Sequence, residues 1–134
     1  MNFLSRLRAE FKKRQSRNIR YSLRAFARDL GTDHATLSQI LRGRRRLSPR
    51  MVRHFGVRLR LEPALIIDFC VQQNAEAILQ LVGAPGFRPS GRWLAARSNI
   101  PLDSVNTALH RLVSSGDLVM QSTNSWIPTR SPYA

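Results

Sequence analysis

The chain is 134 residues long, which is enough for one compact domain or two very small ones. It holds 22 Lys and Arg against 8 Asp and Glu, and residues 1–60 alone contain 17 of the basic residues and 3 of the acidic ones. All basic residues except Lys12 and Lys13 are arginine, which can bind phosphate or guanine through two parallel hydrogen bonds. The net charge of +14 predicts a polyanionic partner, and the arginine content favours nucleic acid.

Few side chains are suited to covalent or metal chemistry. Cys70 is the only cysteine, which excludes an internal disulfide, and His34, His54 and His110 are too far apart for a metal-binding motif. The sequence has no glycine-rich phosphate loop, nucleophile elbow or spaced pair of carboxylates. We therefore expect no enzyme activity, metal or cofactor, and the sequence indicates no small-molecule effector.

Membrane attachment is not expected either. The basic N-terminal segment breaks its apolar run at once, unlike a signal peptide. The apolar run 64–71 contains Asp68 and is too short to cross a bilayer. These features predict a cytoplasmic protein.

The first predicted element is an amphipathic helix whose apolar stripe is formed by Phe3, Leu4, Leu7 and Phe11. Residues 15–21 have little apolar content and are predicted to form a loop.

Two short helices joined by a tight turn are predicted next. The segment SLRAFARDLG offers Ser22 as the helix N-cap and Gly31 as the residue that ends the helix. After a short turn, HATLSQILRG predicts a second helix that ends at Gly43. This arrangement is a helix-turn-helix.

A basic loop over 44–47 is predicted to lead into a closing helix that begins with Ser48 and Pro49. The run 63–82 then predicts one long helix, or two helices broken near residues 73–74.

The pattern of apolar and turn residues changes in the remaining segment. It predicts a helix around Trp93, a second helix that ends at Gly116, and two short strands over 118–120 and 126–127. Helix, helix and β-hairpin in this order describe a winged helix with a short polar tail.

The predicted fold class is therefore mainly α. A helix-turn-helix bundle occupies residues 1–62, a linking helix residues 63–82, and a small winged helix with a β-hairpin residues 83–134.

The segment SLRAFARDLGTDHATLSQILRGRR resembles the Cro and repressor-type helix-turn-helix family, often called Xre-like, and the match covers roughly residues 19–62. The residues that carry the resemblance are Ala27, Gly31, Leu37, Ser38, Ile40 and Gly43. With its downstream helix and hairpin, the chain also looks like bacterial regulators that place a winged helix after such a module. Leu23 departs from the pattern, because the family often has a Gln there that touches a phosphate or braces a base contact.

The resemblance implies that the second helix of the pair lies in the major groove of DNA. Gln39 suits adenine and Ala35 suits a thymine methyl group. The alternative is the solvated face of an ordinary amphipathic helix. The base-reading candidates are His34, Ala35, Thr36, Ser38, Gln39 and Arg42.

Phosphate contacts are expected from two basic groups. One follows the reading helix, where the family's loop faces the DNA backbone, and the other follows the first helix, where it can track a phosphate strand or enter a minor groove. Solvated charge runs are the alternative for both groups. The candidates are Lys12, Lys13, Arg14, Arg17, Arg44, Arg45 and Arg46.

The winged segment offers a second contact or a packing surface. Its DNA-contact candidates are Asn106, Thr107, His110 and Arg111. Asp103 would repel phosphate, and Pro101 replaces the usual hydroxyl cap. The alternative is a dimerisation or packing domain built on Trp93, Leu109, Leu112 and Trp126.

The function expected from the resemblance is a sequence-specific regulator of transcription, a repressor, that binds double-stranded DNA in the nucleoid as a homodimer. The dimer contact is expected at residues 64–71 or in the winged segment. An accessory or architectural DNA-binding protein of a phage or mobile element is the alternative. An RNA-binding protein is less favoured, because Tyr21 is the only aromatic residue of 1–60 predicted to be free.

Overall fold

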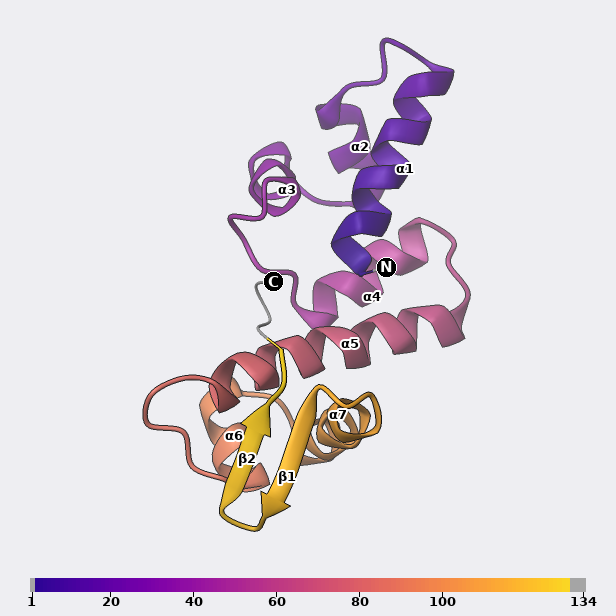
Figure 1. The fold of residues 1–134 in the computed structure, drawn as a ribbon. Coiled ribbons are helices and arrows are strands. Elements are labelled where there is room, and N and C mark those ends of the chain that lie inside the picture. The colour runs from indigo at the N-terminus through magenta and orange to yellow at the C-terminus, as the bar shows by residue number, and fades with distance from the viewer. Residues whose placement is uncertain (1, 131–134) are drawn as a thin grey trace. The chain divides into compact units, whose positions relative to one another are not determined.

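The computed structural model describes residues 2–130, which form seven helices and one two-stranded hairpin (Figure 1). The chain divides into two compact units, Met1–Cys70 and Val71–Ala134, here called unit 1 and unit 2. The predicted fold class is confirmed: the structure is mainly helical and has a small C-terminal β-hairpin. The end of the predicted polar tail, residues 131–134, lies outside the described residues.

Unit 1 is a helical bundle whose helices begin at side-chain caps. Its helices are α1 (Phe3–Arg17), α2 (Leu23–Leu30), α3 (His34–Leu41), α4 (Pro49–Arg58) and the first half of α5 (Pro63–Val82). In each of the first four, a side-chain oxygen before the helix accepts a hydrogen bond from a backbone N–H of the first turn. These caps are Asn2, Ser22, Asp33 and Ser48.

Helix α1 is longer than the sequence predicts. Residues 15–17 are helical, because they include no Gly or Pro to end the helix. The helix ends at Asn18, whose backbone is extended while its N–H still donates to the Arg14 carbonyl. The basic group predicted to follow this helix therefore lies within its last two turns and consists of Lys12, Lys13, Arg14 and Arg17.

The turn between α2 and α3 depends on a glycine. Gly31 has φ of +72°, a left-handed conformation that closes α2, and a Cβ at this position would lie 2.8 Å from His54 Nε2. The same ring nitrogen lies 3.2 Å from the Gly31 carbonyl oxygen. Helix α4 is thus packed against the turn, which fixes the angle between α2 and α3.

The core of unit 1 holds α3 by its inner face. Leu37 and Ile40 are fully buried, as are Phe26 and Leu30 of α2. The remaining large members of this core come from the other helices and include Phe3, Leu7, Val52, Phe55, Ile66 and Phe69. Helices α1, α2 and α4 and the start of α5 therefore determine which face of α3 meets solvent.

Helix α5 is continuous, so the alternative of a break near residues 73–74 is not realised. The boundary between the units falls inside this helix, after Cys70. Its first half buries Ile66, Phe69 and Cys70 in unit 1, and Gly56 leaves the space that Ile66 fills. Much of the apolar run 64–71, predicted as a dimer contact, is therefore used by the core of unit 1.

Unit 2 is a winged helix built on the second half of α5. It contains α6 (Gly91–Ser98), α7 (Leu102–Ser114), β1 (Leu118–Ser122) and β2 (Ser125–Pro128). The antiparallel strands pair Val119 with Ile127 and Met120 with Trp126, and extend beyond the predicted strands by one or two residues at some ends. The residues predicted for a packing or dimerisation surface, Trp93, Leu109, Leu112 and Trp126, belong to or pack against the core of unit 2 itself.

We predict that Gly31→Ala destabilises unit 1 more than Gly43→Ala does. Both glycines have a positive φ, so either alanine costs about 1–2 kcal/mol of backbone energy. At Gly43 the nearest atom to a new Cβ is Arg8 Nη2 at 3.9 Å, whereas at Gly31 the His54 ring must also move. Urea unfolding of the two variants measures the difference, and equal losses of stability would contradict the packing of α4 on the turn.

Candidate nucleic-acid interface

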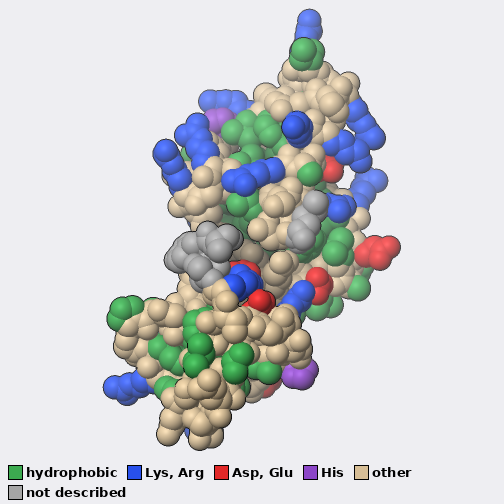
Figure 2. All heavy atoms as spheres, in the orientation of Figure 1, with side chains coloured by type: hydrophobic (Ala, Val, Ile, Leu, Met, Phe, Trp, Pro, Cys, Tyr) green, Lys and Arg blue, Asp and Glu red, His purple; other side chains and the backbone are tan. Residues whose placement is uncertain are grey.

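Positive charge gathers on unit 1. Figure 2 shows Lys and Arg side chains over much of the visible face of this unit, and few over unit 2. In a sequence where 17 of the 22 basic residues lie in positions 1–60, this distribution gives unit 1 a strong positive field. Unit 1 is therefore the part of the chain whose charge suits a polyanion.

Helix α3 presents a polar face to solvent. His34, Ala35 and Gln39 are exposed, and Arg42 is exposed at the C-cap. Thr36 and Ser38 are partly buried at the sides of this face. The structure thus brings the six base-reading candidates onto one short helix, with its apolar residues turned to the core.

The start of α3 is held by a hydrogen-bonded cluster. Asp33 accepts from the Thr36 backbone N–H and from its hydroxyl, both at 2.7 Å, and Arg45 Nη1 donates to the same hydroxyl at 3.3 Å. The bonds from Thr36, together with the nearby charge of Arg45, lower the pKa of Asp33. Thr36 and Arg45 therefore position the first turn of α3.

The end of α3 is held by a residue that the sequence analysis missed. Arg8 donates from Nε at 2.9 Å and from Nη2 at 2.7 Å to the Leu41 carbonyl, one of the carbonyls left without a helical partner. The guanidinium also places positive charge at the negative end of the helix dipole. No local pattern could reveal this contact, because the two residues are 33 positions apart.

Backbone hydrogen bonds hold the basic loop after α3 in place, and its arginine side chains are exposed. The backbone N–H groups of Arg44 and Arg45 donate to the Gln39 carbonyl at 2.9 and 3.3 Å. Leu47 is buried and anchors the far end of the loop, while Arg44, Arg45 and Arg46 are exposed. Their charges are thus held beside the polar face of α3.

Arg14 differs from its basic neighbours on α1. Its guanidinium forms ion pairs with Glu10 at 3.0 Å and Asp29 at 3.1 Å, and its Cζ lies 5.4 Å from the centre of the Phe26 ring. Lys12, Lys13 and Arg17 are exposed. Arg14 therefore stabilises the packing of α1 on α2, and the other three carry the accessible charge.

Tyr21 is part of the same cluster, so the prediction that its side chain is free of contacts within the protein is wrong. Its hydroxyl donates to Asp29 Oδ2 at 2.6 Å and accepts from Arg14 Nη1 at 3.0 Å. Burial and the hydrogen bond to Asp29 raise its pKa, although Arg14 opposes the shift. The ring also packs against Phe11 and Phe26.

The second set of DNA-contact candidates lies on α7 of unit 2. Asn106, Thr107 and His110 are exposed, whereas Arg111 is partly buried and lines a cavity. Helix α7 has no side-chain cap. The hairpin adds no positive charge, because residues 118–129 contain no Lys or Arg. The hairpin of unit 2 therefore offers no cation to a phosphate.

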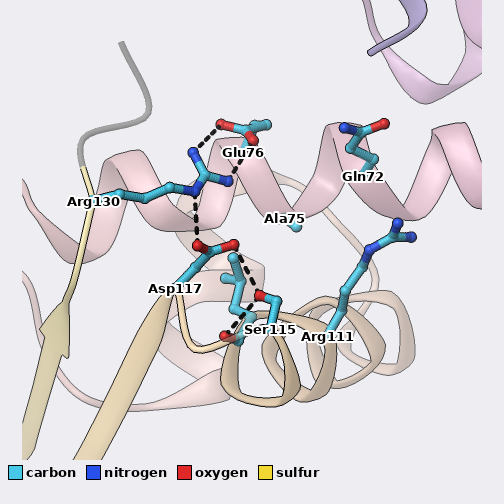
Figure 3. A pocket seen from close by; sticks show the side chains of 8 residues that line it. Gln72, Ala75, Glu76, Arg111, Ser115, Asp117 and Arg130 are labelled. Atoms are coloured by element: carbon cyan, nitrogen blue, oxygen red, sulfur yellow. Dashed lines mark hydrogen bonds and ion pairs between the residues drawn. The ribbon is translucent and has the colours of Figure 1, made fainter. Parts of the chain in front are cut away.

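The cavity in unit 2 has a volume of about 200 Å³ and surrounds an arginine with two acidic partners (Figure 3). Arg130 contacts Glu76 at 2.7 Å and Asp117 at 2.9 Å, and Ser115 donates to Asp117 at 2.8 Å. The two carboxylates compensate the charge of Arg130. This cluster ties the end of the hairpin to α5.

The fold and the site define a mainly helical protein with an N-terminal helix-turn-helix bundle and a C-terminal winged helix. Residues 66–134, just over half of the chain, match the family described as Domain of unknown function (DUF4423), and the chain belongs to this family. No curated protein and no solved structure matches the chain significantly. Within residues 2–130, no helix combines the length and apolar character needed to cross a membrane.

We predict that Asp117→Asn makes the free energy of unfolding of unit 2 fall less steeply as the pH is lowered. Burial acts to raise the pKa of Asp117, but hydrogen bonds from Ser115 and Arg130 and the Arg130 charge outweigh it and lower the pKa. A lowered pKa adds stability above the ordinary carboxyl value of about 4, and this contribution disappears as the pH falls from that value through the folded-state pKa.

The variant should therefore lose up to about 1 kcal/mol at pH 7 and show a shallower decline below about pH 4. Urea unfolding at several pH values measures both effects. Asp103→Asn, on an exposed position of α7, is the matched control. A variant whose stability falls with acid as steeply as that of the unchanged chain would show that the ionised carboxylate of Asp117 contributes nothing to folding.

Proposed function

We propose that this protein is a sequence-specific regulator of transcription, acting as a repressor, that binds double-stranded DNA in the nucleoid with α3 in the major groove. The observation that carries the proposal is a short helix fixed at both ends, whose polar face is flanked by exposed arginines. The resemblance of residues 19–62 to the Xre-like helix-turn-helix family supports the same function. An operator-bound protein that overlaps a promoter would block polymerase.

Base reading is assigned to the exposed positions of α3. The Gln39 amide can bond the N6 and N7 groups of adenine in a bidentate way, and Arg42 can bond the O6 and N7 groups of guanine. Ala35 offers a methyl group to thymine, and His34 lies at the N-terminal tip of the helix. Because both ends of α3 are held by side chains of unit 1, these groups would enter the groove with little loss of conformational freedom.

Phosphate binding is assigned to the exposed cations around α3 and on α1. These are Lys12, Lys13, Arg17, Arg44 and Arg46. Arg14 is assigned a positioning role, because Glu10 and Asp29 both form ion pairs with its guanidinium. Arg45 is assigned one because it donates to the hydroxyl of Thr36 at the start of α3. Each phosphate neutralised releases counterions, so binding should weaken steeply with salt.

The aromatic residues of unit 1 disfavour binding to single-stranded RNA. That mode of recognition stacks bases on accessible rings. Phe3, Phe26 and Phe55 are buried, and Phe11 and Tyr21 are partly buried in a shared cluster. An architectural role would use the same cations, and differs from a regulator in showing little preference among sequences.

Unit 2 is assigned to the assembly of a homodimer rather than to a second DNA contact. Its hairpin carries no cation and exposes Val119 and Ile127, which face each other across the strands. One reading helix touches only a few base pairs, so two copies on a twofold site would provide the needed specificity.

We predict that Gln39→Ala and Arg44→Ala have different effects on binding. Gln39→Ala should lower discrimination at one base pair by about 1–3 kcal/mol, because a bidentate contact to a base is lost. Arg44→Ala should weaken all duplexes alike and reduce the salt slope by about 0.9, because one phosphate contact is lost. Selection from random duplexes followed by salt titration measures both. The same selected sequence for Gln39→Ala and the unchanged chain would contradict the orientation assigned to α3.

We predict that the complex contains two chains on a twofold site. Sedimentation of the purified complex gives the ratio of protein to DNA, and the selected sequence gives its symmetry. Replacing Val119 and Ile127 together by Thr, which keeps β-branched side chains in the strands, should reduce paired occupation of half-sites without abolishing binding to one. A complex of one chain on an asymmetric site would rule out the dimer.

A further inference from the structure

The loop that joins α1 to α2 lies at one end of unit 1 (Figure 1), and its sequence contains Ile19. Ile19 is 94% exposed, more than any other large hydrophobic side chain among the described residues. A single exposed apolar side chain is ordinary on a protein surface. What distinguishes Ile19 is the rigidity of its turn and the charge around it.

The turn is held by hydrogen bonds on both sides of Ile19. The Tyr21 backbone N–H donates to the Asn18 carbonyl at 2.9 Å, and the Arg20 backbone N–H donates to the Asn18 side chain at 3.1 Å. Tyr21 is in turn fixed through its hydroxyl to Asp29 and Arg14. Ile19 therefore projects from a backbone whose conformation is already determined.

The surroundings of Ile19 are cationic. Arg17 and Arg20 flank the turn, and Arg24 lies in the first turn of α2; all three are exposed. The first turn of α2 contains no acidic residue. The N-terminal end of that helix adds further positive potential. An apolar side chain with cations on both sides suits a narrow groove with anionic walls, where it can insert between the apolar faces of two stacked base pairs.

We infer that Ile19 is an apolar wedge that enters the minor groove of the bound duplex, outside the base pairs read by α3, and partly unstacks one base step. Wedges of this kind use Ile, Leu, Phe, Met or Pro beside Arg and Lys, and they kink the duplex. A membrane surface is a poorer fit, since stable binding there requires an apolar face much larger than one side chain. This inference rests on the proposed binding of duplex DNA by unit 1.

The test uses the full chain and a selected duplex that carries 2-aminopurine at successive flanking steps. Binding should raise 2-aminopurine fluorescence at one step, because unstacking relieves its quenching. Ile19→Ala should abolish this rise and weaken binding about tenfold, since a buried isoleucine side chain is lost. Ile19→Lys should keep more of the affinity through phosphate but show no rise. Val57→Ala, at an exposed position of α4, is the matched control and should behave as the unchanged chain.

Equal affinity and equal fluorescence for Ile19→Ala and Val57→Ala would overturn the wedge alone and leave duplex binding intact. A chain that binds no duplex at all would overturn the proposed function as well. Anionic phosphatidylserine vesicles provide a further arm. Binding to vesicles that is lost in Ile19→Ala, with duplex binding unchanged, would assign the side chain to a lipid surface and also overturn the wedge.

Discussion

The fixation of α3 at its two ends is the constraint on which the rest of unit 1 depends. A helix of eight residues is too short to be stable by itself in water, so its geometry must come from outside. Leu37 and Ile40 fix its rotation by burial, and Asp33 and Arg8 fix its ends by hydrogen bonds. These contacts give the exposed side chains of α3 one orientation. They also determine where the flanking cations lie relative to that polar face.

Arginine serves two different purposes in this chain. Arg8, Arg14 and Arg130 are bound by carbonyl or carboxylate oxygens of the protein and hold its elements together. Arg42 and Arg44 lie exposed around α3. The count of 22 Lys and Arg therefore overstates the number of cations available to a partner. The net charge of +14 still favours a polyanion.

The two halves of α5 belong to the cores of different units. The apolar residues of the first half of α5 complete a core that supports α3, and those of the second half complete the core of a winged helix without a cationic wing. The chemistry proposed for DNA thus resides in unit 1. The family match covers residues 66–134, which include none of the residues assigned to the proposed DNA interface.

The sequence by itself determined the elements whose signals are local. Ser22 and Ser48 cap their helices, and Gly31 ends α2, because a hydroxyl before a helix and a glycine after it act on backbone groups a few residues away. The apolar spacing of α3 likewise determined which of its residues are exposed. These predictions needed no knowledge of distant contacts.

Only the tertiary structure decided which polar side chains form hydrogen bonds or ion pairs within the protein. The Leu41 carbonyl that binds Arg8 lies 33 residues away in the sequence. The partners of Tyr21 lie on the two helices that its loop joins, and they meet it only because those helices pack together. Arg14 and Arg17 look alike in the sequence, yet one is bound by two carboxylates and the other is exposed. Hydrogen bonds between distant residues depend on how the helices pack, and the pattern of a single segment does not contain that information.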